Sequence, residues 1–411
     1  HAATSDNLID WEPVLDENGE PTKFIDLRKG YFDSSLTECG PPAILTDKGI
    51  LLIYNGRNHS DIKIADPQFP RGTYSGGQVL FDKNDPVIYK GVVYNEMQGA
   101  YSSPERILGD EIDKSLYPDT CYRFSSGGKP EKIPELSYEE FLDFHKKHYH
   151  PSNSYIYLYG NGDIEKQLKF IDEEYLSNFE KAEIDSEILI QLPFKERQET
   201  IAYYPILKDD SDENRSYLSL NFALGEIIDP ELYLMTSILG ILLIDMEGAP
   251  LKKALIDAEI GEDIFSMSTG GIQPGFSIIA KNSSMDKKEK FESTVFNTLE
   301  KLVKEGIDRK LIEATINIVE FNLREAMKFP TKGLIYNMQA LDSWLYDDSP
   351  TTHLKYNATI EKLKNNMDTN YFEKFIEERL INNPHSSLVI INPKKGLGDS
   401  EIKEIIKGKK P

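Results

Sequence analysis

Histidine offers this chain its most direct route to metal chemistry, and the sequence holds seven, at positions 1, 59, 145, 148, 150, 353 and 385. A zinc-binding helix of the form H-x-x-E-H places two imidazoles on one face, with a glutamate beside them that activates water. None of the seven histidines has this spacing. His145 and His148 share a helix face, but Pro151 ends that helix, so we interpret His145, His148 and His150 as a structural helix end.

Other polar groupings in the chain favour structure over chemistry. We interpret Asn317, Glu320, Arg324 and Glu325 as a buried polar set that braces a long helix. The glycine pairs at 127–128 and 270–271 are typical of turns. The sequence has no G-x-x-x-x-G-K-[ST] phosphate-binding loop.

The composition indicates a soluble globular protein, with 39% hydrophobic and 28% charged residues in 411. A net charge of −22 argues against a nucleic-acid partner, which calls for a basic surface. With only Cys39 and Cys121, and no signal peptide recognised, we expect a reducing compartment, a bacterial cytoplasm. The apolar run 232–244 is too short to cross a bilayer, so we predict a buried helix and no membrane partner.

The hydrophobic periodicity changes near residue 87. Residues 1–86 are rich in strand and turn signals, such as the runs 49–56 and 72–82. Beyond them we predict helices at 88–115, 137–149 and 164–181 around a strand at 154–159. Further strands are expected at 200–206, 216–224, 262–268, 275–281 and 386–392, and helices at 229–244, 249–258, 286–305, 307–328, 331–346 and 353–382.

This order predicts an α+β fold, a largely antiparallel sheet with one helical layer, preceded by an all-β fragment. We divide the chain into residues 1–86, 87–193, 194–393 and a Lys-rich tail, 394–411, interpreted as a truncated linker. His1 is interpreted as the cut end of a longer chain.

The most specific motif is YKGVVYNEMQGAYSSPE at 89–105, followed by SLYPDTCYRFSSGGKPEKIPELSYEEFLDFHKKHYHPSNSYIYLYGNGD at 115–163. Together they resemble the pitrilysin/insulinase group of zinc metallopeptidases, in its presequence-protease-like branch. The resemblance continues through YLSLNFALG, INIVEFNLREA and GLIYNMQALDSWLYDDSP and covers residues 87–393. It implies that 87–193 is the end of a first peptidase domain and 194–393 a second, associated domain.

The resemblance also implies a zinc site and peptide substrates. In that family two histidines of H-x-x-E-H and a later glutamate bind Zn²⁺, and the match to NEM makes Glu96 the third ligand. Because H-x-x-E-H is missing here, the partners of Glu96 are missing too. We therefore predict that this chain does not hold catalytic zinc and is inactive as a peptidase.

The first 86 residues resemble an unrelated family. TSDNLIDWEPVLDENG (4–19), GYFDSSLTECGPPAILTDKGILLIYNGRN (30–58) and YSGGQVLFDKNDP (74–86) are similar to five-bladed β-propeller glycosidases, the β-mannoside phosphorylases and mannosidases. The resemblance implies that Glu38 is an active-site carboxylate and that a mannoside is the ligand. It also implies substrate or phosphate contacts for Asp33, Arg57, Asn58 and His59.

The two resemblances meet at Asp85-Pro86, which both families accommodate. We interpret the chain as a hybrid of two incomplete pieces joined there. Three functions follow: a partial zinc metallopeptidase of the pitrilysin/insulinase family, a fragment of a β-mannoside phosphorylase or mannosidase, and a non-catalytic peptide-binding module. We favour the first as family identity, because it covers about three quarters of the residues.

Overall fold

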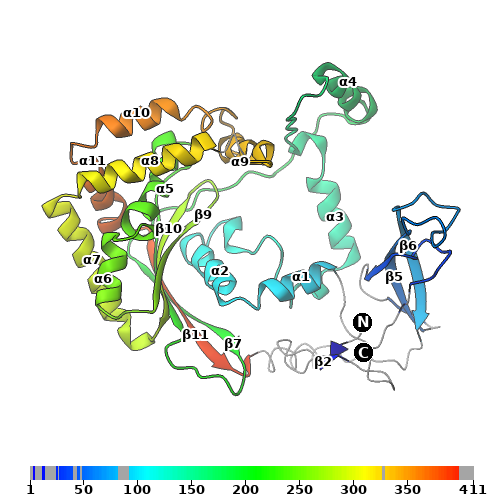
Figure 1. Ribbon diagram of the computed structural model, residues 1–411, viewed down its shortest axis with the longest axis horizontal. Helices are drawn as coiled ribbons and strands as arrows, with labels where there is room; N and C mark the ends of the chain where they lie inside the picture. The colour runs from blue at the N-terminus through cyan, green and yellow to red at the C-terminus, as the bar shows by residue number, and fades with distance from the viewer. Residues whose placement is uncertain are drawn as a thin grey trace.

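The computed structural model describes residues 3–4, 12–13, 25, 27–39, 44–46, 49–81, 92–325 and 329–397 (Figure 1). The predicted junction at Asp85-Pro86 lies outside these residues, as does most of the predicted linker 394–411.

A five-stranded sheet organises the larger part of the protein. Its strand order is β7-β11-β8-β10-β9, and every neighbouring pair is antiparallel except β11 and β7, which run parallel. The prediction of an α+β fold with a largely antiparallel sheet is therefore confirmed. The strands are β7 (Gln198–Ile206), β8 (Ser216–Ala223), β9 (Asp263–Thr269), β10 (Gly275–Ser283) and β11 (Ser386–Lys395).

One face of this sheet carries the apolar core. Alternate residues of β8, such as Leu218, Leu220 and Phe222, are fully buried beneath a helical layer, as period-two alternation requires. From α7, Phe291 and Val295 complete the contact. The layer consists of α5 (Pro230–Gly240), α6 (Pro250–Asp257), α7 (Lys288–Glu305), α8 (Arg309–Glu325), α10 (Asn357–Asn365) and α11 (Tyr371–Ile376), with α9 (Lys332–Trp344) beyond it.

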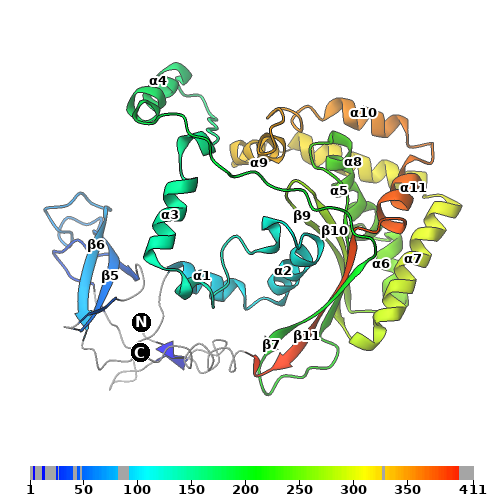
Figure 2. The same ribbon diagram turned by 180° about the vertical axis from the view of Figure 1, so that it is seen from behind.

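The other face of the sheet is covered by α2 (Pro104–Leu116), as Figure 2 shows from behind. Leu108, Ile112 and Leu116 recur every four residues, so they form one stripe, and all three are fully buried. They pack with Val389 and Ile391 of β11. The prediction of a single helical layer was wrong, because alternation also places apolar residues on this second face.

The packing of α2 joins residues on both sides of the predicted domain boundary at 193–194. Its side chains share one buried cluster with β7, β8, β10 and β11. Besides these apolar contacts, the Tyr117 hydroxyl donates a 2.6 Å hydrogen bond to the carbonyl of Gln273. The division into 87–193 and 194–393 stays a prediction of the sequence.

Two helices that the periodicity predicts as continuous are interrupted. The expected helix 88–115 is divided into α1 (Val92–Ala100) and α2, because Ser103 caps α2 and Pro104 occupies its first position. The expected helix 353–382 is divided into α10 and α11 by a turn at 366–370. Hydrophobic periodicity detects the apolar face that two consecutive helices share, but it does not detect the break between them.

The strand predicted at 154–159 is irregular in the structure. A strand needs a neighbour for its backbone hydrogen bonds, and none of the strands that the structure describes pairs with this segment. Instead its rings lie against α9, with Tyr155 4.7 Å from Trp344 and Tyr159 6.1 Å from Tyr336 between ring centroids.

Two further helices project from the body as an arm (Figure 1). The first is α3 (Tyr138–His148), which begins with a capping box between Ser137 and Glu140. The second is α4 (Ile164–Glu174), capped by Asp163 and shorter than the predicted 164–181.

The amino-terminal part contains a second sheet. It joins β3 (Leu36–Cys39), β4 (Ile44–Thr46), β5 (Gly49–Arg57) and β6 (Tyr74–Phe81), with β5 bonded to the other three, and a separate pair joins β1 (Ala3–Thr4) to β2 (Glu12–Pro13). The described sheet is open, not closed into a propeller, so the propeller fragment stays a prediction.

The helical stretch Pro230–Asp257 is long and apolar enough to span a membrane by length and composition alone. Within it, 61% of the most apolar window is buried inside the protein. Leu234, Met235 and Leu239 belong to the core against the sheet, so this stretch is the predicted buried helix.

Candidate functional site

The predicted zinc ligand Glu96 lies on α1 with its side chain exposed, next to the buried Met97. Across the described ranges, no group of three or more His, Cys, Asp or Glu side chains lies close enough to hold a metal ion. The described residues therefore do not fit catalytic zinc. The assignment of Glu96 as a former ligand stays a prediction of the resemblance.

The three neighbouring histidines make structural contacts. His145 stacks on Tyr149 at 4.6 Å between ring centroids. His148 contacts Phe144 at the same distance. The Nδ1 atom of His150 accepts a 3.1 Å hydrogen bond from the backbone N–H of Ser152. Their interpretation as a helix end agrees with these contacts.

The predicted glycosidase carboxylate Glu38 is exposed on β3, opposite Asn55 of β5. Asp33 has a different position, fully buried between Arg28 and Tyr54. Its Oδ2 accepts hydrogen bonds from the Tyr54 hydroxyl at 2.6 Å and from Arg28 Nε at 2.9 Å. Burial and the hydrogen bond to Asp33 raise the pKa of Tyr54 to about 12. Asp33 thus braces the sheet and is not available to a sugar.

The remaining candidates of this piece are also engaged within it. The Asn58 side-chain amide is buried and bonds to the backbone of Asp66 and Phe69. Arg57 lies over the ring of Tyr74 at 5.7 Å. The Nδ1 atom of His59 accepts from the backbone of Asp61. These contacts stabilise the segment 58–73, and the structure does not gather the candidates around Glu38.

The polar set predicted on the long helix is on its surface. Asn317 and Arg324 are exposed, so their assignment as buried was wrong. Glu320 forms ion pairs with Arg324 and, across to α10, with Lys364. Four-residue spacing explains the first pair, and the second joins α8 to α10.

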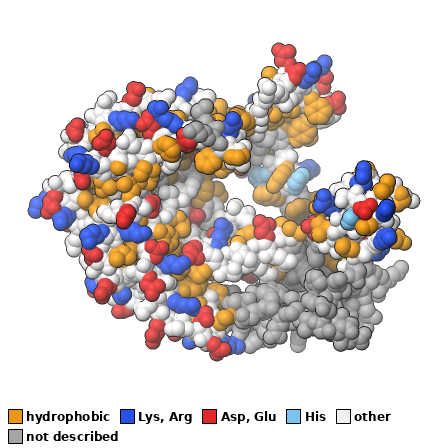
Figure 3. Space-filling view, in the orientation of Figure 1, with side chains coloured by type: hydrophobic (Ala, Val, Ile, Leu, Met, Phe, Trp, Pro, Cys, Tyr) orange, Lys and Arg blue, Asp and Glu red, His pale blue; other side chains and the backbone are white. Residues whose placement is uncertain are grey.

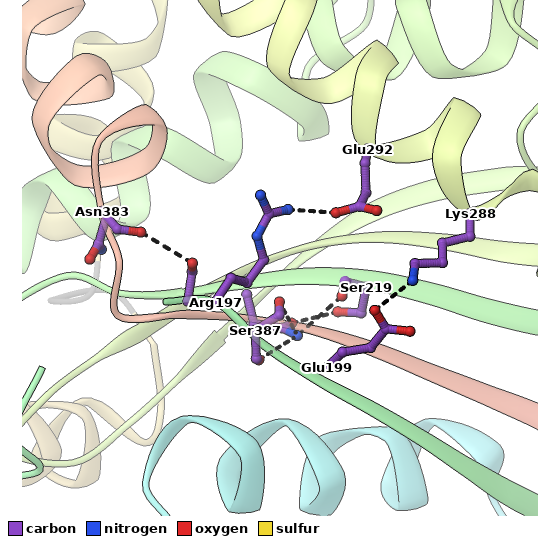
Figure 4. A network of polar contacts seen from close by, with 9 residues as sticks. Arg197, Glu199, Ser219, Lys288, Glu292, Asn383 and Ser387 are labelled. Atoms are coloured by element: carbon purple, nitrogen blue, oxygen red, sulfur yellow. Dashed lines mark hydrogen bonds and ion pairs between the residues drawn. The ribbon is translucent and has the colours of Figure 1, made fainter. Parts of the chain in front are cut away.

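A polar network that the sequence did not predict lies beneath α2, on the second face of the sheet. Ser115 of α2 shares a 2.7 Å hydrogen bond with Ser387, and Asn221 Nδ2 donates to Ser387 Oγ at 3.2 Å. Ser219 donates to Asn221 in turn. Figure 4 shows Ser219 and Ser387 on the neighbouring strands β8 and β11, where both bond to Asn221. The only sequence signal for this network is the alternation of the strands, which places these polar side chains on one face of the sheet.

A second polar contact holds the start of α2. Glu105 accepts hydrogen bonds from Lys281 Nζ at 2.6 Å and from the Tyr217 hydroxyl at 2.7 Å. Burial alone would raise the pKa of Glu105, but these hydrogen bonds prevail and lower it from 4.5 to about 2.

This contact predicts an acid-sensitive contribution to stability. Because the folded pKa of Glu105 is depressed, its contribution is present above pH 4.5 and is lost as the pH falls toward 2. We expect Glu105→Gln to be less stable than the parent at pH 7 and equally stable near pH 2. Urea unfolding at both pH values measures this, with Glu111→Gln on the same helix as control. A constant difference at both pH values would contradict it.

The sheet presents a free edge at β7, which pairs only with β11 among the strands that the structure describes. Pro205 lies within β7 and lacks an N–H donor, which an edge strand tolerates. On the face away from α2, Ile201 is 41% and Tyr203 50% exposed. Figure 4 shows ion pairs from Arg197 to Glu292 and from Glu199 to Lys288, which fix the start of β7 to α7.

An unpaired, apolar strand edge is a surface that adds an extended peptide by backbone hydrogen bonding. The anchored end and the exposed pair Ile201 and Tyr203 give β7 a fixed geometry and two apolar contact points. Among the described elements, this edge is the arrangement best suited to hold a ligand.

Comparison with solved structures identifies the class of fold. A protease from Helicobacter pylori aligns with a TM-score of 0.55 at 16% identity, over 74% of this chain and 70% of that one. The peptidase M16 inactive domain from Pseudomonas fluorescens aligns with a TM-score of 0.50 at 17% identity, over 74% and 69%. At these identities the likeness shows the fold alone, which is that of the M16-like peptidases.

The sequence comparisons agree with the fold. Residues 135–319 match the family described as the peptidase M16 inactive domain. "Protein HypA" of Clostridium perfringens is 51% identical over 331 residues, which are 79% of this chain and 34% of that protein. Presequence protease 1 of Arabidopsis thaliana, chloroplastic/mitochondrial, is 36% identical over 76% of this chain and 30% of its own length.

These findings support an M16-like, presequence-protease-like assignment for the larger part of the chain. The chain spans about a third of the length of these curated relatives. A putative glycoside hydrolase from Bacteroides ovatus is 59% identical over 21% of this chain and 25% of its own, with a TM-score of 0.19. A score at that level carries no structural argument, so the glycosidase resemblance and the hybrid both stay predictions.

Proposed function

We propose that this chain binds peptides through the edge of an M16-like inactive domain and does not cleave them. The observation that carries the proposal is the free edge of β7, on a sheet whose fold is M16-like. The peptidase relatives point to peptide ligands, since two curated relatives are named presequence proteases. Catalysis in a complete relative would need zinc ligands that Glu96 alone does not supply.

The charge of the chain favours a basic peptide. A net charge of −22 attracts cationic ligands and speeds their association at low ionic strength. We therefore propose basic, extended peptides as the ligand class. The mannoside activity implied by residues 1–86 has no support in the geometry around Glu38, and we do not propose it.

Isothermal titration of the full chain with a basic peptide, followed by mass spectrometry of the recovered peptide, tests both parts of the proposal. We expect heat of binding, an intact peptide after prolonged incubation, and the same affinity with and without a chelator. Cleavage that a chelator abolishes would overturn the claim of no turnover. The absence of binding would overturn the claim of peptide recognition.

Substitutions locate the binding edge. Ile201→Lys places a positive charge at the proposed contact, where it repels a basic peptide without touching the core, and we expect it to weaken peptide binding roughly tenfold. Ser268→Lys introduces the same group at an exposed position of β9, the opposite edge strand, and should leave the affinity unchanged. If only Ser268→Lys weakened binding, the peptide would lie on β9 and the assignment to β7 would be wrong.

A further inference from the structure

The helix α3 is exposed on every side, which is unusual for a folded element. All its residues from Tyr138 to Lys147 are exposed, among them Tyr138 at 70%, Phe141 at 54% and Leu142 at 44%. A helix of 11 residues is marginal by itself in water, since most helical stability comes from packing an apolar face. Figure 3 shows hydrophobic and histidine side chains together on the surface of this arm.

Most of the exposed apolar residues of α3 are ordered into a stripe, and Phe144, which is 60% exposed, lies outside it. Tyr138, Phe141, Leu142, His145 and Tyr149 follow three- and four-residue spacing, so they share one side of the helix. A stripe with this spacing is the side that a helix presents to another helix. The rest of the described chain leaves it open to solvent.

The charged residues beside this stripe have opposite signs at its two ends. Glu139 near the start of α3 and Lys146 near its end are seven residues apart, so they lie on the same flank of the stripe. Both side chains are exposed. The opposite side of the helix carries Lys147, four positions after Asp143.

We propose that α3 pairs in antiparallel orientation with α3 of a second copy of this chain. A two-fold axis brings the same flank of both helices together with their ends reversed. Glu139 of each copy then faces Lys146 of the other, and the centre of the contact falls at Leu142. In a parallel pair, this flank would instead face the opposite flank of the partner, so Glu139 and Lys146 of one copy would not meet those of the other.

This self-complementarity selects a second copy over other occupants. The acidic and basic positions match only when the partner carries the same pattern in reverse, which a second α3 does. The apolar stripe supplies the buried contact, and the two Glu139–Lys146 contacts set its direction. The inference is independent of the proposed function, since it uses neither β7 nor any metal ligand.

Sedimentation velocity of the full chain, over a concentration series at about 0.15 M salt to screen its net charge, tests the pairing. We expect a monomer–dimer equilibrium that Leu142→Asp abolishes. Because Leu142 is exposed in the monomer, the far-ultraviolet spectrum of that variant at low concentration should match the parent.

Charge reversal tests the orientation. Lys146→Glu faces Glu139 twice in each dimer, and we expect the dissociation constant to rise roughly tenfold. Glu139→Lys should act alike, and the double variant should restore the parent value. Lys147→Glu makes the same charge change on the opposite side and should have no effect. A monomer at every concentration, a dimer insensitive to Leu142→Asp, or a double variant weaker than each single one would overturn the proposal.

Discussion

Replacement of Ile112 by alanine is expected to lower the free energy of unfolding by about 3 kcal/mol. Ile112 is fully buried between α2 and the second face of the sheet, in one cluster with Val389 and Ile391. Removing its side chain leaves a cavity that α2 cannot close, because Leu108 and Leu116 hold the helix on either side. Urea denaturation at pH 7, followed by circular dichroism, measures the change.

The same exchange at Ile318 is the matched control. Ile318 lies on α8 and is 37% exposed, so Ile318→Ala should lower the stability by only about 1 kcal/mol. If α2 were only loosely attached, both variants would behave alike. That outcome would contradict the description of α2 as part of the sheet's core.

Asp113→Asn is expected to stabilise the protein at pH 8 by up to about 4 kcal/mol. Burial, and then the negative charge of Asp110, raise the pKa of Asp113 from 3.8 to about 7. The folded state therefore binds the proton more tightly than the unfolded state. The stability that this proton contributes is fully present below pH 3.8 and is lost as the pH rises through 7. Asparagine keeps the side chain neutral at every pH.

Urea unfolding at pH 5 and pH 8 separates this effect from a general change in packing. The parent should lose stability between these pH values, and Asp113→Asn should lose much less. Glu111→Gln removes the same charge from the same helix and should retain the pH dependence of the parent. An equal pH dependence in Asp113→Asn and the parent would show that Asp113 is charged in the folded state at pH 5.

Hydrophobic periodicity was sufficient to predict the five strands of the main sheet and most of the helices of its layer. It failed where a partner decides the structure. The run Tyr155–Tyr159 has every local mark of a strand, yet a strand exists only with a neighbour to accept its hydrogen bonds. The same limit applies to α2. Its apolar stripe predicts that one face of the helix is buried, but it does not predict which surface covers that face.

The candidate site was less accessible to sequence reasoning. The resemblance implies roles for both Asp33 and Glu38, but a buried carboxylate and an exposed one look alike in a sequence, and only the structure separates them. The free edge of β7 depends on strand order, which requires β11, some 190 residues later, to occupy the inner position. Local patterns carry no such information, since edge and inner strands differ mainly in their neighbours.

The parallel pairing of β7 with β11 has a consequence for how the protein is made. Because β11 lies between β7 and β8, the first strand of the sheet has no partner until residue 386 has emerged from the ribosome. The strands β8 and β10, which pair with each other in antiparallel orientation, are both synthesised much earlier than β11. During synthesis the chain therefore carries β7 and the apolar stripe of α2 without their final contacts. We expect the chain to be most prone to aggregation at this stage, and slowing of translation before residue 386 should prolong it.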